Sequence, residues 1–405
     1  MKPIQVGLLG LGTVGSGTFE VLKRNHAEIQ RRLGKPLAIS MVADLDTAKA
    51  KSMVGASCQV VADARQVIAN PEIDIVIELI GGYGIALELV LSAIEAGKHV
   101  VTANKALLAL HGNEIFAAAQ RKGVMVGFEA AVAGGIPIIK SLREGLSANR
   151  IEWLAGIING TTNFILSEMR DKGLDFGDVL KEAQRLGYAE ADPTFDIEGV
   201  DAAHKLTLLA SLAFGIPVQF EKAYIEGISK LAAEDIKLAE RLGYRIKLLG
   251  ITKRRPEGIE LRVHPALVPS KSMLANVEGA MNAVLVRGDA VGQTLYYGKG
   301  AGSEPTASAV IADLVDITRL LSADAEHRVP YLAFQPDAVQ DTPVLPIGEI
   351  TTSYYLRLRV ADQAGVLADI TKILAAHSVS IDALLQKEAD EGESQTDLVA
   401  LTHET

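Results

Sequence analysis

The feature that most constrains the fold is a glycine-rich turn that directly follows the first apolar segment. Residues 4–10, IQVGLLG, have the length and composition of a buried strand, and an amphipathic helix is expected over residues 14–32. Between them Gly10, Gly12 and Gly15 form the pattern G-x-G-x-x-G. The first glycine allows a tight turn, the second lets a pyrophosphate approach the backbone, and the third allows close helix packing. The turn predicts a dinucleotide site, with a glycine turn that binds nothing as the alternative.

The residues around this turn indicate which dinucleotide would bind. Thr13 and Val14 begin the helix, so their N–H groups are expected to face the phosphates. Asp44 follows the next apolar segment, where a carboxylate would accept a hydrogen bond from the ribose 2′-hydroxyl of NAD. Lys49 and Lys51 could instead hold the 2′-phosphate of NADP, and Asp44 could be a plain turn residue. Both NAD and NADP therefore stay open.

Repeated strand and helix patterns define the first domain. Further apolar segments at 37–43, 73–79, 98–103 and 124–130 alternate with helical patterns. Such alternation predicts an α/β fold with a doubly wound parallel sheet of the Rossmann type. The segment 98–103 leads into Lys105, and ligands of such sheets collect beyond the carboxyl ends of the strands. Lys105 is therefore a candidate site residue, with an ordinary surface lysine as the alternative.

The rest of the chain predicts two further units and a connection between them. Strand-like segments at 153–160, 245–253 and 259–268 and a helix over 200–214 predict an α+β domain. A long helix after Gly302, with Pro305 in its first turn, is expected to pack back on the first domain. Prolines at 330, 336, 343 and 346 predict a linker, and strand, helix and strand patterns follow it. The predicted division is 1–130 plus 304–322 for the dinucleotide domain, 131–303 for catalysis and oligomerisation, 323–350 for the linker, and 351–405 for a small third unit.

Charge and cysteine usage exclude several classes of protein. The chain has 40 basic and 50 acidic residues, and a net charge of -10 repels nucleic acids and anionic membranes. The single cysteine, Cys58, cannot form an intrachain disulfide or a cysteine-based metal site. The sequence also lacks an apolar run of about 18 residues that could span a membrane. We therefore expect a soluble cytoplasmic protein that acts on small molecules.

An acidic segment, YAEADPTFDIEGVDAAHK at 188–205, carries five carboxylates ahead of one lysine. A solvated loop is one interpretation, but Asp201 and Lys205 are spaced i, i+4 on the expected helix and can touch. Reduction of a carbonyl needs a cation or proton donor beside the oxygen, and a neighbouring carboxylate would keep a shielded ammonium charged. The other acidic residues would hold a cationic group of the substrate, such as an amino group. An amino-acid aldehyde would fit this arrangement.

The chain as a whole resembles homoserine dehydrogenase. The resemblance rests on the pattern A-x-x-x-G-Y-A-E-A-D-P-x-x-D-I-x-G-x-D-x-x-x-K from Ala183 to Lys205, on NGTTNFIL at 159–166, and on GFEAAVAGGIPII at 127–139. It implies reversible reduction of L-aspartate 4-semialdehyde to L-homoserine with NADPH or NADH, on the route to threonine and methionine. It also implies a homodimer or homotetramer.

The resemblance assigns roles to individual residues. Lys205 matches the proton donor, Asp201 a residue that assists it, and Lys105 a lysine between cofactor and substrate. Glu190 matches the residue that binds the substrate amino group, and Asp196 another substrate-binding aspartate. Further matches are Gly187 and Gly302 beside the nicotinamide half of the cofactor, and Glu129, Val132, Gly134 and Ile136 around a structural sodium-like cation.

Three expectations remain for the other motifs. In NGTTNFIL, Thr161 or Thr162 should cap a helix, and Thr161 could also line the substrate pocket; His204 is expected to be structural. Residues 351–405 resemble an ACT domain that lacks its last helix and strand, so binding of an effector such as threonine stays open. Two rival functions are a thioester-forming semialdehyde dehydrogenase, for which Cys58 is badly placed, and a non-catalytic sensor of nucleotides or amino acids.

Overall fold

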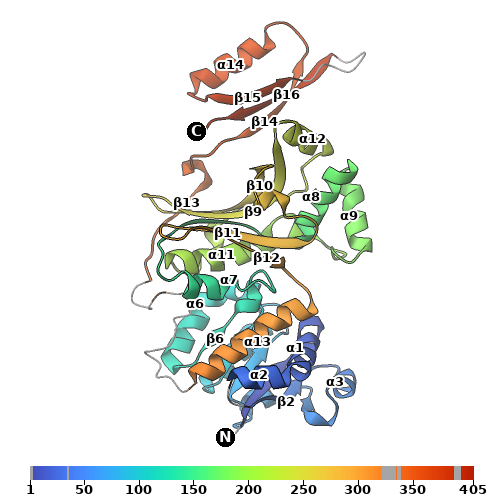
Figure 1. The fold of residues 1–405 in the computed structure, drawn as a ribbon, viewed down its shortest axis with the longest axis vertical. Coiled ribbons are helices and arrows are strands. Elements are labelled where there is room, and N and C mark those ends of the chain that lie inside the picture. The colour runs from blue at the N-terminus through green and yellow to red at the C-terminus, as the bar shows by residue number, and fades with distance from the viewer. Residues whose placement is uncertain (1–2, 34–35, 322–333, 335–338, 387–393) are drawn as a thin grey trace.

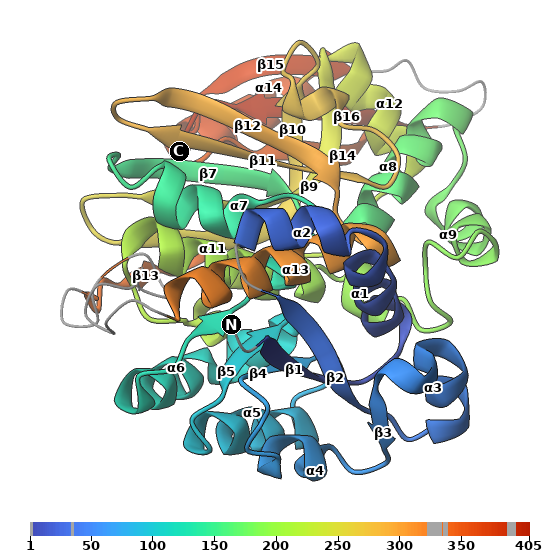
Figure 2. The same cartoon turned by 60° about the horizontal axis from the view of Figure 1, so that its bottom comes forward.

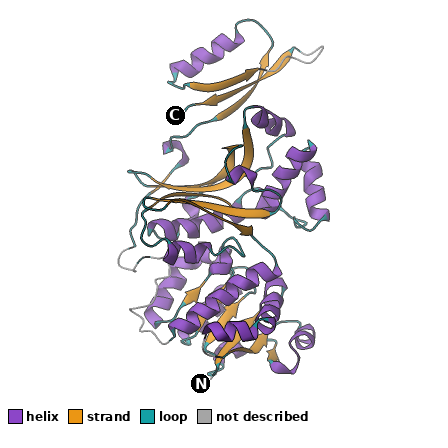
Figure 3. Cartoon of the chain, in the orientation of Figure 1, coloured by secondary structure: helices purple, strands orange, loops and turns teal. Residues whose placement is uncertain are grey.

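The computed structural model describes residues 3–33, 36–321, 334, 339–386 and 394–405. Three units are stacked along the long axis of the molecule, with the N-terminal sheet at the bottom, a larger sheet in the middle and a small sheet at the top (Figure 1). Helices are packed around the bottom unit, further helices lie below the sheet of the middle unit and at one end of it, and a helix covers the small sheet (Figure 3). The predicted combination of a Rossmann-type unit, an α+β unit and a small third unit is confirmed.

The first sheet has six parallel strands in the order β3-β2-β1-β4-β5-β6. Its elements are β1 (Ile4–Leu9), α1 (Thr13–Arg24), α2 (His26–Leu33), β2 (Leu37–Ala43), α3 (Thr47–Val54), β3 (Gln59–Val61), α4 (Ala64–Ala69), β4 (Ile75–Glu78), α5 (Ile85–Glu95), β5 (His99–Thr102), α6 (Lys105–Lys122) and β6 (Val126–Gly127). The strand order reverses between β1 and β4. Ligands bind at such a reversal because the two flanking connections leave on opposite faces and open a crevice.

Two expectations for this unit are wrong in detail, and one strand was not expected. The helix expected over 14–32 is two helices that break at Asn25, a residue type that favours helix ends over helix interiors. The edge strand β3 went unpredicted because three residues are too few to show a period. The strand expected over 124–130 ends at Gly127, and Glu129–Ala131 form a 3-10 turn. Because β3 adds one strand to the four apolar segments expected up to residue 103, Lys105 follows the fifth strand of the chain and not the fourth.

The second sheet runs in the order β12-β11-β7-β9-β10-β13, with β8 paired to β10. The unit contains α7 (Ile138–Lys140), β7 (Ile151–Ile157), α8 (Gly160–Lys172), α9 (Phe176–Arg185), α10 (Thr194–Ile197), α11 (Val200–Phe214), β8 (Tyr224–Ile225), α12 (Ala233–Arg241), β9 (Tyr244–Arg254), β10 (Ile259–Pro269), β11 (Met281–Gly288) and β12 (Gly292–Lys299). Helix α11 is buried from its second residue to its end, between α6 of the first unit and strands β9 and β10. It therefore lies at the junction of the two units.

Helix α13 (Ser303–Leu320) returns to the first unit and packs on α1, α2 and β5, as Figure 2 shows from below. Residues 323–333 and 335–338 of the predicted linker lie outside the described residues. Its described part contains β13 (Val344–Leu345), which pairs with the start of β10. The exact division of the chain into domains stays a prediction.

The third unit is a three-stranded antiparallel sheet with one helix. It contains β14 (Tyr355–Ala361), α14 (Val366–Ala376), β15 (Ile381–Gln386) and β16 (Gln395–Thr402), in the sheet order β14-β16-β15. The predicted strand, helix and strand are present, with β16 in addition. This unit contacts α12 through Asp235, whose carboxylate accepts from the Tyr355 hydroxyl and pairs with Arg357, both at 3.1 Å. Among the described helices, none is both long and apolar enough to cross a membrane.

The glycine turn after β1 provides a stability test. A Cβ on Gly15 would lie 2.1 Å from the Gly10 carbonyl oxygen, whereas one on Gly12 would meet nothing within 4 Å. Gly15→Ala should therefore lower the free energy of unfolding by about 1–3 kcal/mol, and Gly12→Ala should leave it close to wild type. Urea unfolding of the unliganded protein measures both values. Equal midpoints for the two variants would contradict this account of the turn.

Candidate active site

A cavity of about 390 Å³ opens beyond the carboxyl ends of β1, β2 and β4, at the reversal of strand order. Gly10, Gly12, Asp44 and Arg65 contribute to its walls. Gly10 has a φ of +89°, in the left-handed region that favours glycine, and Gly12 leaves open space beside its α-carbon. Because a pyrophosphate needs close access to the backbone at such a turn, these residues fit a dinucleotide.

Asp44 is held rigidly at the wall of this cavity. One carboxylate oxygen accepts from the Leu11 N–H at 2.7 Å, and the other accepts from the Asp46 N–H at 2.9 Å. Each oxygen keeps a second lone pair for a ribose hydroxyl. Lys49 and Lys51 are exposed and do not line the cavity.

Among the described residues that line the cavity, Arg65 has the cationic side chain, and the sequence analysis missed it. Its guanidinium donates to Glu88 at 2.7 Å and lies 3.7 Å from Asp63. Thr13 and Val14 begin α1, as predicted, and the Thr13 carbonyl accepts from the Ser303 hydroxyl of α13 at 2.8 Å. The return helix is thus bonded directly to the start of the dinucleotide turn.

Lys205, Asp201 and Lys105 form one cluster at the junction of the first two units. The Lys205 Nζ lies 2.5 Å from one Asp201 carboxylate oxygen, and the Lys105 Nζ lies 3.2 Å from the other. Lys205 also donates to the Ile158 carbonyl at 2.8 Å, just past the end of β7. The side chain of Lys205 is 11% exposed and that of Lys105 is 35% exposed. The cluster therefore has a buried ammonium and one that solvent or a ligand can reach.

Burial and the neighbouring charges shift the pKa values of Asp201 and Lys205. Burial would raise the pKa of the Asp201 carboxyl, but the two ammonium groups beside it lower that pKa to about 2. Burial lowers the pKa of Lys205 and Lys105 lowers it further, while Asp201 raises it, and the net direction is down. The carboxylate next to Lys205 thus favours the charged form, as expected, but burial outweighs it. A lysine with a lowered pKa is a better proton donor than an exposed one.

Asn159 is the central residue that the sequence analysis missed. Its Nδ2 donates to Asp196 at 2.7 Å and to Asp201 at 2.9 Å. Its Oδ1 accepts from the Thr162 N–H at 2.8 Å, so Asn159 is the N-cap of α8. The prediction that Thr161 or Thr162 caps this helix is wrong. Asparagine is among the favoured N-cap residues, and its position directly after a strand was the available signal.

The other predicted substrate residues are only partly gathered around this cluster. Asp196 is half-buried; burial and the neighbouring Asp201 raise its pKa, while Asn159 opposes the shift. The Thr161 hydroxyl lies 3.3 Å from Asp196 and donates to the Tyr188 carbonyl at 2.7 Å. Glu190 lies on an exposed segment, as does Gly187, which has a φ of +78°. The structure thus connects Asp196 to the lysine cluster and places Glu190 on an exposed segment.

The segment 129–136 packs against the turn before α13. A Cβ on Gly134 would lie 2.5 Å from the Gly300 carbonyl oxygen, so the two backbones are in close contact. Gly302 is the N-cap of α13, with a φ of +122°. Ala133 and Gly134 both have positive φ, at 55° and 49°, which bends the backbone sharply.

The Glu129 side chain is hydrogen-bonded within the protein. Its carboxylate accepts from the Ile139 and Lys140 N–H groups at 2.9 and 2.8 Å, and burial raises its pKa to about 7. In the described part of the chain no group of three or more His, Cys, Asp or Glu side chains could hold a metal ion. Val132 and Ile136 are buried apolar residues. A cation at this segment would therefore depend mainly on backbone oxygens, which suit hard cations.

These features define a class of enzyme. A glycine turn that opens on a cavity at the reversal of strand order, together with a buried ammonium paired with a carboxylate, fits an NAD(P)-dependent oxidoreductase that acts on a CH–OH group. The chain is 62% identical over 403 residues to a homoserine dehydrogenase of Pseudomonas aeruginosa, covering 100% of this chain and 92% of that protein. The chain belongs to the homoserine dehydrogenase family.

Family models and solved structures agree with this assignment. Residues 10–129 match the NAD-binding domain of homoserine dehydrogenase, residues 137–315 match homoserine dehydrogenase, and residues 354–405 match the ACT domain. The crystal structure of a homoserine dehydrogenase from Thiobacillus denitrificans is 68% identical with a TM-score of 0.95, covering 100% of this chain and 92% of that one. A hyperthermophilic archaeal homoserine dehydrogenase in complex with NADPH is 27% identical with a TM-score of 0.67, covering 80% and 100%.

His204 provides a pH test of its expected structural role. It packs between Phe195 and Phe220, and burial lowers its pKa to about 4. The unfolded chain therefore binds a proton that the folded chain does not between about pH 6.5 and 4. Stability should fall as pH falls through this window, by an amount on the order of 3 kcal/mol. Urea unfolding at several pH values should show a flatter profile for His204→Leu. A profile that His26→Leu, an exposed control, flattens equally would contradict the assignment.

Proposed function

We propose that the chain catalyses the reversible reduction of L-aspartate 4-semialdehyde to L-homoserine with NADPH or NADH, on the route to threonine and methionine. The observation that carries the proposal is the buried Lys205 ammonium, held between Asp201 and the Ile158 carbonyl. Such an ammonium is a proton donor fixed in position and shielded from water. The proposed substrate is inferred from the family of the chain, and the proposed proton transfer is inferred from the geometry of the Lys205 cluster.

The proposed mechanism assigns one task to each residue of the cluster. The bound nicotinamide cofactor supplies the hydride that reaches the aldehyde carbon. Lys205 donates a proton to the aldehyde oxygen as negative charge builds there, and the product is an alcohol. Asp201 orients Lys205 and favours its charged form, and Lys105, the more exposed ammonium, adds positive charge beside the oxygen. In the reverse direction Lys205 accepts the proton.

The acidic residues would hold the substrate amino group. Asp196 is supported by its bond to Asn159, which places it beside the cluster. Glu190 is exposed, and we propose that it reaches the amino group when the substrate binds. Gly187 and Thr161 would line the same pocket, and Gly302 would contact the nicotinamide half of the cofactor.

Several further properties are proposals with partial support. A sodium-like cation would bind at Glu129, Val132, Gly134 and Ile136, supported by the sharp bend of that segment. A homodimer or homotetramer is supported by half-buried Ile251, Ala266 and Leu295 on an apolar cluster of the second sheet. Threonine remains a proposed effector of the third unit, and the cytoplasmic location stays a prediction.

The thioester-forming alternative finds no support around Cys58. Its sulfur donates to the Ile39 carbonyl at 2.8 Å, beside the edge strand β3, and burial raises the pKa of the thiol. A reactive cysteine needs a lowered pKa. The Lys205 cluster likewise gives the sensor alternative less support than the enzyme.

The general acid can be tested by Lys205→Met, which keeps the volume and removes the proton donor. We expect kcat to fall by at least about a hundredfold, because Lys105 is more exposed and lies on the other oxygen of Asp201. NADH affinity, measured by calorimetry, should stay within about twofold because the cavity of Asp44 is separate from the cluster. A variant that turns over normally, or that loses cofactor binding instead, would exclude Lys205 as the acid.

Asp44→Ala should reveal which cofactor the cavity favours. Loss of two charge-assisted bonds to the ribose should raise the KM for NADH roughly tenfold or more. The KM for NADPH should rise less, because a 2′-phosphate is repelled by the same carboxylate. Initial rates with the two cofactors measure both values, and Lys49→Ala serves as an exposed control. Equal effects on the two cofactors would show that Asp44 only holds the turn.

A further inference from the structure

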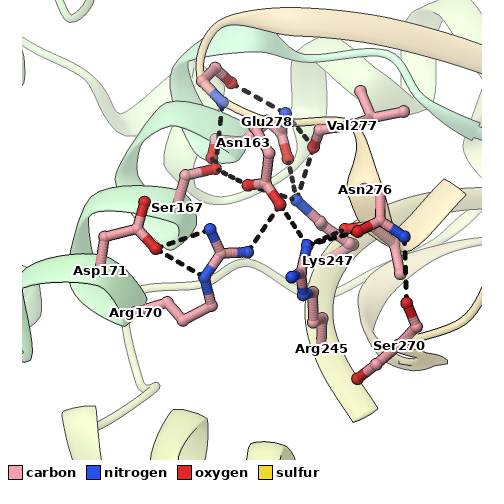
Figure 4. A network of polar contacts seen from close by, with 12 residues as sticks. Asn163, Ser167, Arg170, Asp171, Arg245, Lys247, Ser270, Asn276, Val277 and Glu278 are labelled. Carbon is pink, nitrogen blue, oxygen red and sulfur yellow. Dashed lines mark hydrogen bonds and ion pairs between the residues drawn. The ribbon is translucent and has the colours of Figure 1, made fainter.

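A buried polar network lies behind the first turn of α8, outside the residues of the proposed mechanism (Figure 4). Lys247 on β9 and Asn163 on α8 form its centre, and both are 1% exposed. The Lys247 Nζ donates to the Asn163 Oδ1 at 3.0 Å and to the Val277 carbonyl at 2.6 Å. Burial of an ammonium is unfavourable unless its protons are bonded. An apolar side chain would fill the same space without this cost, so stability alone explains this lysine poorly.

Helix α8 presents one polar face to the segment 276–281. Asn163, Ser167 and Arg170 lie on this face because they follow at helical spacing. The Asn163 Nδ2 faces three backbone carbonyls of that segment at 3.1, 2.8 and 3.1 Å. Ser167 and Arg170 donate to the Glu278 carboxylate at 3.0 and 2.7 Å. The helix is therefore joined to the segment along two turns.

The first turn of α8 is in direct contact with the same segment. A Cβ on Gly160 would lie 2.8 Å from the Ala280 carbonyl oxygen. One residue earlier, the Asn159 amide donates to the Asp201 oxygen that also bonds Lys205, which leaves the other oxygen for Lys105. A shift of this turn would therefore move the amide away from Asp201.

We propose that Lys247 and Asn163 are positioning residues for the reaction: by holding the first turn of α8 against the segment 276–281, they place the Asn159 amide on Asp201. Neither residue touches the substrate, the cofactor or the reacting atoms. The inference rests on the proposed roles of Asp201 and Lys205. It explains why a charged donor is buried at this place, because a charged hydrogen bond holds its partner more strongly than a neutral one.

The electrostatic surroundings of Lys247 agree with this role. Burial lowers the pKa of Lys247 to about 8, and Arg170 and Arg245 lower it too, whereas Glu278 at 3.6 Å raises it. The ammonium thus remains mostly protonated at pH 7. Arg245 is also bonded to Asn276 at 2.9 Å, at the far end of the segment.

The test compares Lys247→Met with Lys98→Met. Lys98 is a matched control because it is also buried and donates to two backbone carbonyls, those of Asn70 and Ile73 at 2.8 and 2.6 Å, in the first unit. At pH 7, Lys247→Met should lower kcat for the semialdehyde roughly tenfold or more and change the KM for NADH by less than about twofold. Lys98→Met should lose comparable stability in urea unfolding and keep wild-type kcat.

Asn163→Ser and the double variant complete the test. If the two residues act through one turn, Asn163→Ser should show a similar loss of kcat, and the double variant should lose no more than about threefold beyond the worse single variant. If Lys247→Met does not fold, Asn163→Ser alone is compared with Lys98→Met. A kcat within twofold of wild type in either folded variant, or losses that multiply in the double variant, would overturn the inference.

Lys205→Met in the same assay separates the two proposals. If that variant is inactive while Lys247→Met turns over like wild type, only the positioning role fails. If Lys205→Met keeps its turnover, the proposed role of Lys205 fails and the positioning role loses its basis. If the wild-type chain does not turn over the semialdehyde, the proposed function itself fails.

Discussion

The structure depends on a carboxylate buried between two ammonium groups. Asp201 bonds Lys205 at 2.5 Å and faces Lys105 at 3.2 Å. Buried charges are costly to desolvate and are tolerated only when each one is paired and hydrogen-bonded. Asp201 and Lys205 both lie on α11 and Lys105 begins α6, so the ion pair between Lys105 and Asp201 joins the two helices. The pairing that joins the two units also holds the Lys205 ammonium, the proposed proton donor, in place.

Two helices, α11 and α13, join the first unit to the second around this group of charges. Helix α11 lies buried between the first unit and the second sheet, so the proposed substrate site at its first turn lies at the junction of the two units. Helix α13 returns to the first unit and bonds the start of the dinucleotide turn through Ser303. The chain thus connects the two units twice. The network around Lys247 holds the start of α8, from which the Asn159 amide reaches Asp201.

Local patterns predicted much of this arrangement. The strand, glycine turn and helix at the N-terminus have a short-range signature, because Gly10 needs a left-handed φ and a Cβ on Gly15 would meet the Gly10 carbonyl oxygen. The pairing of Asp201 with Lys205 followed from helical spacing alone. Asn159 was missed although asparagine is a favoured cap, because its two carboxylate partners are 37 and 42 residues away. Strand β3 was missed because it is too short to show a period, and the break at Asn25 because one residue interrupts an otherwise amphipathic pattern.

The sequence by itself determined the fold class, the dinucleotide turn and the lysine–aspartate pair, because these features arise between residues that are neighbours along the chain. Only the tertiary structure decided that Lys105 shares Asp201 with Lys205, that Arg65 lines the cofactor cavity, and that burial lowers the pKa of Lys205. Desolvation and contacts between distant segments depend on how the units pack. No local spacing specifies that packing.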